Sequence, residues 1–454
     1  MIRIGIKRGM RDNMAKSVFF FIMIFCFVSE LSALSPSEVR RIKTINENGK
    51  QYFKDKDYSR AVAQFRNALN LNPASNTLKA NLAQSLIGEA IFEKNKGNVS
   101  KSIALLKEAI GLDDTIADAH IILAACYLEI GDYTGAKGEL EIARIFAPGR
   151  ASIHTMLGEI YFQEGDMENA LECWSKTKEQ QPYNENIGRK IEQAQREWTL
   201  LKNFSTKSAH PFVIMYEPQN EHLVRQAVDI CSDAYMEVGK IFNHYPLSRI
   251  TIIFYAPGQF LDITSAPNSV AGLYDGKIRI KCSERTNDPR QLRKLLFHEY
   301  THVLVKYLTN DECPFWLNEG LAQAVSGPVT DIDLEILANL ELENDLFHIK
   351  NMGRFAGVTH VLDHELDSSL AVKIAYIKSL ITTNYMINTY GMNRCMRLLE
   401  ELRTRTPIEV AVQKAIGISV EELDSQVMSL ISKTKDELLS VLNKQDNSAG
   451  DIQQ

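Results

Sequence analysis

A 17-residue pattern that occurs four times before residue 183 constrains the fold more than any other feature of the chain. Its copies are DYSRAVAQFRNALNLNP, NVSKSIALLKEAIGLDD, DYTGAKGELEIARIFAP and DMENALECWSKTKEQQP. The fifth position is always small (Ala61, Ser102, Ala136 and Ala170), and successive copies are 41, 34 and 34 residues apart. A second small residue lies twelve positions earlier, at Gly49, Ala90, Ala124 and Gly158. Small side chains let helices approach closely, so the pattern predicts stacked helix pairs.

The period of 34 residues, with small, aromatic and proline residues in a fixed order, resembles the tetratricopeptide repeat, a helix-turn-helix unit. The second copy is seven residues longer, which equals two helical turns and predicts a longer first helix with an unchanged buried face. No repeat buries its apolar face alone, so we expect an all-α solenoid over residues 37–201, with Glu185–Leu201 as a capping helix. The resemblance implies that the array binds a peptide or protein partner. An array that only spaces or docks the next domain is the alternative.

The first 33 residues have the pattern of a signal peptide. Five basic residues precede the apolar run SVFFFIMIFCFV, which is short for a membrane span, and Met14 is an alternative start. We therefore expect export to a periplasmic or extracellular location, with an uncleaved N-terminal anchor, and hence a membrane, as the alternative. Cleavage after residue 33 would remove five basic and two acidic side chains and change the formal charge from -6 to -9. An acidic balance of this kind argues against a nucleic-acid partner.

A second domain is predicted over residues 209–432, where the helical period gives way to strands. FVIMY and RITIIFY read as strands on either side of a long helix, and AGLYDGKIRIK reads as a hairpin with Asp275-Gly276 at its turn. Helices follow to the end of the domain, with a break at Gly391. We expect residues 433–454 to form the end of the last helix and a polar tail.

The motif HEYTH, from His298 to His302, places ionisable groups inside an otherwise apolar helix. Asp288 suits the N-cap of this helix and Pro289 its first position. Two histidines four residues apart lie one turn apart on one face and can bind one metal ion, whereas Glu299 points elsewhere, toward a metal-bound water. Burying such groups without a partner costs several kcal/mol, about 3–5 when one member of a buried pair is lost. A metal ion is therefore the first candidate.

Catalytic zinc takes three protein ligands, so a third must come from a neighbouring element. Glu319, in CPFWLNEGLAQAVSG, meets that need from a predicted second helix. The longer motif that would add a histidine is absent, because Val305 and Leu308 occupy the positions that need Gly and His. Two imidazoles and a carboxylate favour Zn²⁺.

In this combination the chain resembles the gluzincin metallopeptidases, and more closely the Peptidase MA-like domains. The resemblance runs from about Phe212 to Ser432 and rests on AGLYDGKIRI, HEYTH, PFWLNEGLA, AYIKSLITTNYMINTYG and GISVEELDSQV. It implies an α+β zincin-like fold in which His298, His302 and Glu319 bind zinc and Glu299 is the general base. It also implies that a substrate backbone pairs with the strand at 272–274.

The resemblance is less definite about the remaining site residues. A tyrosine or histidine downstream of the glutamate ligand would stabilise the oxyanion; Tyr376 is our choice, with His360 and His364 as rivals and a packing role as the alternative for Tyr376. Related enzymes place an aspartate one turn after the glutamate ligand to orient a histidine. Here that position is Gln323, whose carbonyl could accept the same hydrogen bond more weakly.

The sequence thus predicts a multidomain protein: an exported zinc-dependent peptidase, acting on a peptide or protein substrate, with a repeat array that recruits a protein. Two other functions remain open. One is a non-catalytic binding scaffold whose peptidase-like domain has lost turnover. The other is a purely structural role of the repeats, which predicts that deleting residues 209–454 leaves the phenotype intact.

Overall fold

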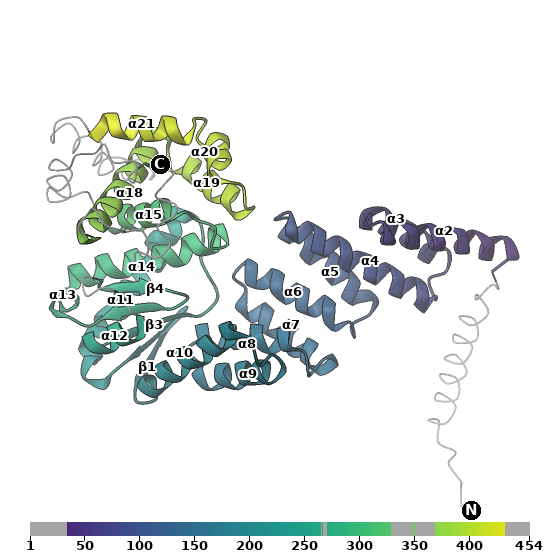
Figure 1. The fold of residues 1–454 in the computed structure, drawn as a ribbon, viewed down its shortest axis with the longest axis horizontal. Coiled ribbons are helices and arrows are strands. Elements are labelled where there is room, and N and C mark those ends of the chain that lie inside the picture. Colours follow the sequence, from purple (N-terminus) through teal and green to yellow (C-terminus); the bar gives the residue numbers. More distant parts are fainter. Residues whose placement is uncertain (1–33, 265, 267–269, 328–347, 350–367, 432–454) are drawn as a thin grey trace, which may run out of the picture. The chain divides into compact units, whose positions relative to one another are not determined.

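A computed structural model describes residues 34–264, 266, 270–327, 348–349 and 368–431 (Figure 1). The predicted signal segment, the polar tail, His360 and His364 lie outside these residues. The chain divides into two compact units, one running to Glu89 and including 111–113, the other holding the remainder. None of the described helices combines the length and the apolar character that crossing a membrane requires.

The repeat region consists of paired helices, as the sequence predicts. The first helices of the pairs are α2 (Pro36–Lys54), α4 (Asn76–Asn95), α6 (Ala117–Glu129) and α8 (Ala151–Gln163). Their partners, each of 14 residues, are α3 (Tyr58–Leu71), α5 (Val99–Leu112), α7 (Tyr133–Phe146) and α9 (Met167–Gln180). Helix α4 has 20 residues against 13 in α6 and α8, which confirms the two added turns. Helix α10 (Glu185–Leu201) is the predicted capping helix.

Two recurring features explain why these residues form such pairs. The aspartate that opens a copy caps the second helix: Asp57, Asp132 and Asp166 each accept a hydrogen bond from the backbone N–H three residues on. The predicted small residues are fully buried, because Ala61, Ser102, Ala136 and Ala170 are all 0% exposed. The small side chain at this position therefore lies inside each helix pair.

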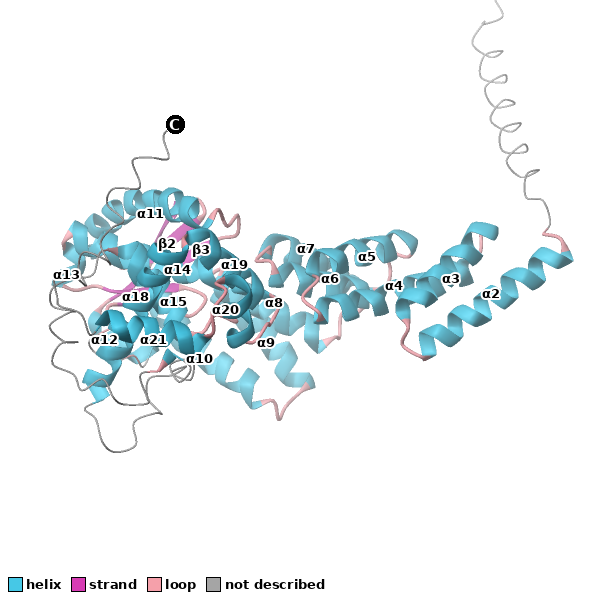
Figure 2. Cartoon of the chain, turned by 90° about the horizontal axis from the view of Figure 1, so that it is seen from above, coloured by secondary structure: helices cyan, strands magenta, loops and turns pink. Residues whose placement is uncertain are grey.

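The following domain contains a five-stranded sheet in the order β1-β2-β3-β5-β4. Strands are drawn in magenta in Figure 2. The strands are β1 (Ser205–Ala209), β2 (Phe212–Tyr216), β3 (Ile250–Tyr255), β4 (Gly272–Tyr274) and β5 (Ile278–Lys281). The β2–β3 and β3–β5 pairs are parallel, whereas the β1–β2 and β4–β5 hairpins are antiparallel. The predicted strands and hairpin are confirmed, and β1 is an addition. Among the described strands, β4 forms one edge.

Helices cover both faces of this sheet. On one face Ile252, Phe254 and Ile280 pack in a core with α11 (Glu221–Phe242) and α14 (Pro289–Thr309). On the other face Ile253 and Tyr255 pack with α12 (Pro257–Thr264) and with buried residues of α9 and α10. The last helices of the repeat array therefore belong to the core of the sheet.

The remaining helices extend away from the sheet (Figure 1). The 3₁₀ turn Pro218–Asn220 precedes α11, and the short α13 (Glu284–Asn287) precedes α14. Helix α15 (Phe315–Ser326) follows α14. The last described helices are α18 (Ser368–Tyr390), α19 (Met392–Arg403), α20 (Ile408–Ala415) and α21 (Val420–Ile431). Helix α15 packs between α14 and α18, and the predicted break between α18 and α19 is Gly391, with a φ of 83°. This order places residues of α14, α15 and α18 around one site.

Candidate metal centre

Helix α14 carries the HEYTH motif and begins where the sequence predicts. Asp288 is its N-cap and accepts a hydrogen bond from the N–H of Arg290, and Pro289 is its first residue. The helix is buried along most of its length, and Glu299 and His302 are only 3% and 8% exposed. The motif therefore lies in the interior, next to α15.

Three side-chain donors converge between α14 and α15. The Nε2 atoms of His298 and His302 are 3.2 Å apart. The Nε2 atom of His298 lies 3.5 Å from Oε2 of Glu319, and that of His302 lies 3.6 Å from Oε1. Zinc binds such donors at about 2.1 Å, and two ligands of a tetrahedral ion are then about 3.4 Å apart. The spacing fits one ion with a further position left for water. Among the described residues these three form the one cluster of His, Cys, Asp or Glu side chains with such a geometry.

The electrostatics of Glu319 and His302 agree with this fit, whereas burial would lower the pKa of His298 but Glu319 and Glu299 raise it above its usual value. Burial alone would raise the pKa of Glu319, but His302 and His298 hold it below its usual value. Burial lowers the pKa of His302, which favours the neutral imidazole that binds metals. The Oε2 atom of Glu319 is buried and has no hydrogen-bond partner among the described residues. A buried carboxylate oxygen without a partner is costly, and a bound cation would satisfy it.

Glu299 lies beside the three donors. Its Oε2 atom is also buried without a hydrogen-bond partner in the described chain, and burial raises its pKa to about 7. Strand β4 passes directly over it: a Cβ on Gly272 would come within 2.6 Å of its Oε1 atom. Only glycine lets the strand pass this close, so an acid with an unusual pKa lies under the edge of the sheet.

One orienting residue was missed by the sequence reasoning. The Nδ1 atom of His302 lies 2.9 Å from Oδ1 of Asn318, so the ring donates this proton to the amide and leaves Nε2 free to bind a metal. Asn318 directly precedes the candidate ligand Glu319, and that adjacency is the signal that could have found it. Gln323 instead donates its amide N–H to the carbonyls of Glu319 and Tyr376, and no hydrogen bond joins it to either histidine in the described residues. Gln323 therefore does not accept the hydrogen bond from a histidine that the sequence predicted for it.

Tyr376 is brought to the site by the contact between α15 and α18. A Cβ on Gly320 would lie 2.4 Å from the carbonyl oxygen of Ser379, so the two helix backbones nearly touch. The ring of Tyr376 packs edge-on against Phe315, with centroids 5.5 Å apart. Burial, followed by the charges of Glu319 and Glu299, raises the pKa of Tyr376. The tyrosine therefore stays protonated near both carboxylates and can donate a hydrogen bond.

Comparison with known families agrees with this division of the chain. Residues 286–433 match the sequence model of the Peptidase MA superfamily, and residues 151–176 match that of the tetratricopeptide repeat. The first match contains the whole candidate metal centre, and the second covers most of the α8–α9 pair. The chain combines tetratricopeptide repeats, which serve protein–protein interaction, with a Peptidase MA-like domain.

Individual relatives are distant. The chain is 27% identical over 115 residues to the SGT1 protein homolog of Oryza sativa subsp. japonica, or 25% of this chain and 29% of the relative. It is 25% identical over 155 residues to the DnaJ homolog subfamily C member 7 of Homo sapiens, and this match covers 32% of this chain and 29% of the relative. The chain thus spans less than a third of these curated relatives. The match to a crystal structure of MamA protein has 21% sequence identity and a TM-score of 0.29. It covers 35% of this chain and 83% of the MamA chain.

Proposed function

We propose that this chain is a zinc-dependent peptidase that hydrolyses peptide bonds with a metal-activated water. The observation that carries the proposal is the spacing of His298, His302 and Glu319, which suits a tetrahedral ion with an open position, beside the buried acid Glu299. The match to the Peptidase MA superfamily supports the same reaction class. Zinc bound there would supply a Lewis acid for the scissile carbonyl and water acidified toward neutrality.

Glu299 is the general base in this proposal. An ideal base has a pKa near the working pH, and burial gives Glu299 a pKa of about 7 in the metal-free protein. Its unpartnered Oε2 atom accepts a proton from the attacking water. The same oxygen then delivers that proton to the departing amine nitrogen, so the acid returns to its carboxylate form after each turnover.

Three further groups support the reaction. Asn318 fixes the tautomer and direction of His302 through the 2.9 Å hydrogen bond. The hydroxyl of Tyr376 donates a hydrogen bond to the developing oxyanion. The edge strand Gly272–Tyr274 pairs with the backbone of an extended substrate and lays it across Glu299.

The proposal is tested with Glu299→Gln, which keeps the shape of the side chain and removes its basicity. We expect a purified protein with one zinc per chain and peptide hydrolysis reduced by about 10²–10⁴-fold. Glu284→Gln, an exposed glutamate ahead of α14, is the matched control and should keep full activity. His298→Ala should lose the metal. A zinc-loaded wild type that hydrolyses no peptide, so that Glu299→Gln changes nothing measurable, would favour the non-catalytic scaffold, and activity unchanged by Glu299→Gln would exclude Glu299 as the base.

Export and partner binding are part of the same proposal. The basic segment and apolar run ahead of residue 34 support secretion, and the tetratricopeptide match supports recruitment of a protein partner or substrate by the repeats. N-terminal sequencing of the protein from its native cell tests the first point. A mature chain beginning near residue 34 is the expected result, and a retained N-terminus would favour the anchor.

A further inference from the structure

Two cationic side chains are buried where strand β5 faces the repeat array. Lys277 and Arg279 are both 0% exposed, although the alternation KIRIK would suit a strand with one face in water. Ile278 and Ile280 point the other way, into the core that contains α14. Burying two cations is costly unless anions compensate them.

Helix α10 of the array supplies the compensating charge through Glu197, which is itself 0% exposed. Its carboxylate accepts hydrogen bonds from Lys277 at 2.9 Å, from Arg279 at 2.7 Å and 3.2 Å, and from the hydroxyl of Tyr255 at 2.7 Å. Arg279 also pairs with Asp275 at 2.9 Å. The positive charges of Lys277 and Arg279 are therefore balanced by the negative charges of Glu197 and Asp275. Burial would raise the pKa of Glu197, but Lys277 and Arg279 lower it to about 2, so this carboxylate stays ionised.

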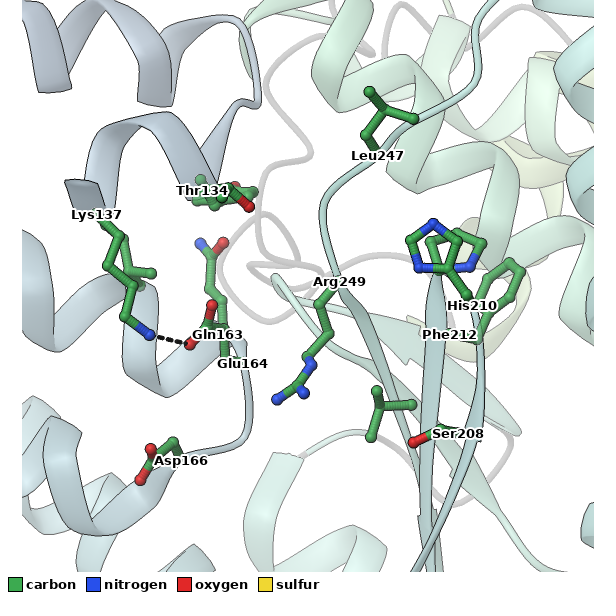
Figure 3. Close-up of a pocket in the computed structure, with 14 residues that line it drawn as sticks. Thr134, Lys137, Gln163, Glu164, Asp166, Ser208, His210, Phe212, Leu247 and Arg249 are labelled. Carbon is green, nitrogen blue, oxygen red and sulfur yellow. Dashed lines mark hydrogen bonds and ion pairs between the residues drawn. The ribbon is translucent and has the colours of Figure 1, made fainter. Parts of the chain in front are cut away.

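Other contacts hold the same side of the sheet against α8. The ammonium of Lys277 lies 3.4 Å from the ring centroid of Phe162, and the hydroxyl of Thr251 donates to the carbonyl of Gln163 at 2.8 Å. A cavity of about 530 Å³ remains between α7 and α8 and the turn from β1 to β2, where Lys137 and Glu164 pair across from Arg249 (Figure 3). At the turn of the β4–β5 hairpin a Cβ on Gly276 would be in ordinary contact with Gln163, 3.5 Å from its Nε2 atom.

The ion network connects directly to the strand above Glu299. Arg279 stands opposite Leu273 in the β4–β5 register, and Leu273 packs in the core that α10 shares. The neighbouring Gly272 is the residue that passes over Glu299. A shift of Arg279 would therefore move β4 relative to the candidate base.

We infer that Glu197 is a positioning residue of the peptidase: a carboxylate from the repeat array fixes the β4–β5 hairpin, and with it the substrate strand, over Glu299. The inference rests on the proposed function and extends the substrate site into the array. Glu197 touches no reacting atom. It acts through Arg279 and strand β4.

The test compares Glu197→Gln with Glu192→Gln, an exposed glutamate on the same helix, in the full-length protein loaded with zinc. Glu197→Gln should keep one zinc per chain while kcat/KM for an extended peptide falls about 10–100-fold, mainly through a higher KM, because strand alignment is lost. Hydrogen–deuterium exchange of residues 272–281 should become faster. Glu192→Gln should match the wild type in all three measurements.

Glu197→Gln leaves a net buried positive charge and could unfold, so a second variant restores the balance. In Glu197→Gln/Lys277→Met only the Arg279–Asp275 pair remains, and we expect slow exchange of the hairpin and most of kcat/KM to return. Unchanged kcat/KM and exchange in Glu197→Gln would overturn the inference, as would an activity loss that only follows lost zinc. An inactive wild type would instead overturn the proposed function, and the exchange measurement, which needs no turnover, tells the two failures apart.

Discussion

Asn318 illustrates how one amide can orient a candidate metal ligand. Its Oδ1 atom accepts the Nδ1 proton of His302 and so directs Nε2 at the ion position. Removing such an orienting partner lowers metal affinity by about 10–100-fold in comparable sites. We therefore expect Asn318→Leu to raise the dissociation constant for zinc by that factor, measured by competition with a chelator.

Asn318→Asp is the matched control, because a carboxylate also accepts the hydrogen bond. Its zinc affinity should stay within a few fold of the wild type. Equal affinities of the leucine variant and the wild type would show that His302 needs no orienting partner.

The raised pKa of Glu299 predicts how the free energy of unfolding of the metal-free protein depends on pH. Its pKa is about 7 in the folded protein against 4.5 for an ordinary glutamate, so between these values the folded state holds a proton that the unfolded state has released. The free energy of unfolding therefore decreases as pH rises through this window. In Glu299→Gln that decrease should be smaller by up to about 2 kcal/mol between pH 5 and pH 7.

Urea unfolding in the presence of EDTA at pH 5, 6 and 7 measures the difference. Glu284→Gln should retain the slope of the wild type. The same slope in Glu299→Gln would mean that this carboxyl titrates as if it were in water.

The residues of the candidate site differ in how visible they are in the sequence. His298 and His302 follow from helical periodicity, and Glu319 follows from the coordination that zinc needs. Asn318 takes the accepting role that was expected of Gln323, because hydrogen bonds depend on side-chain direction, which spacing does not fix. Lys277 and Arg279 lie 80 and 82 residues from Glu197 in the sequence, and no local pattern connects them to it.

At the scale of elements, the α15–α18 contact decides where Glu319 and Tyr376 lie. Gly320→Ala would place a methyl group 2.0 Å from the hydroxyl of Thr383 and 2.4 Å from a backbone oxygen that cannot yield. We expect a loss of about 1–3 kcal/mol in the free energy of unfolding, together with weaker zinc binding, measured by urea unfolding and metal titration.

Gly138→Ala in α7 is the control for helix propensity, since an added Cβ there meets nothing within 4 Å. It should raise stability by up to about 1 kcal/mol. A Gly320→Ala protein as stable as the wild type would mean that α18 can move away from α15 at little cost.

Among the elements, those with strong periodicity were predictable and β1 was not. The repeat helices, the capping helix and the strands FVIMY and RITIIFY have clear apolar patterns. Strand β1 reads STKSA and is mostly exposed, so only its pairing with β2 makes it a strand. The hairpin AGLYDGKIRIK was predicted from its turn, but the charged face of KIRIK gave no sign that a helix covers it.

At the scale of the molecule, the capping helix α10 should decide which truncations fold. A chain beginning at residue 203 loses the helices that cover Ile253, Tyr255 and Phe260, and exposing several such buried side chains costs about 1.5–3 kcal/mol for each. This is comparable to the whole stability of a domain, about 5–15 kcal/mol. We expect this chain to be insoluble or to unfold without a cooperative transition, as followed by circular dichroism.

A chain beginning at residue 76 keeps helices α4 to α10 and serves as the control. It should bind one zinc per chain and unfold cooperatively. A soluble, zinc-binding protein that begins at residue 203 would contradict the structural role of α10.

The burial of Glu197 beneath the sheet also limits how such chains can be recombined. A chimaera that grafts a foreign set of repeats onto this domain must retain α8 to α10 from the recipient, because all three helices pack against the sheet. The permissible junction lies ahead of α8, around residues 147–150. Lineages that exchanged their repeats as cassettes should show their crossover points there.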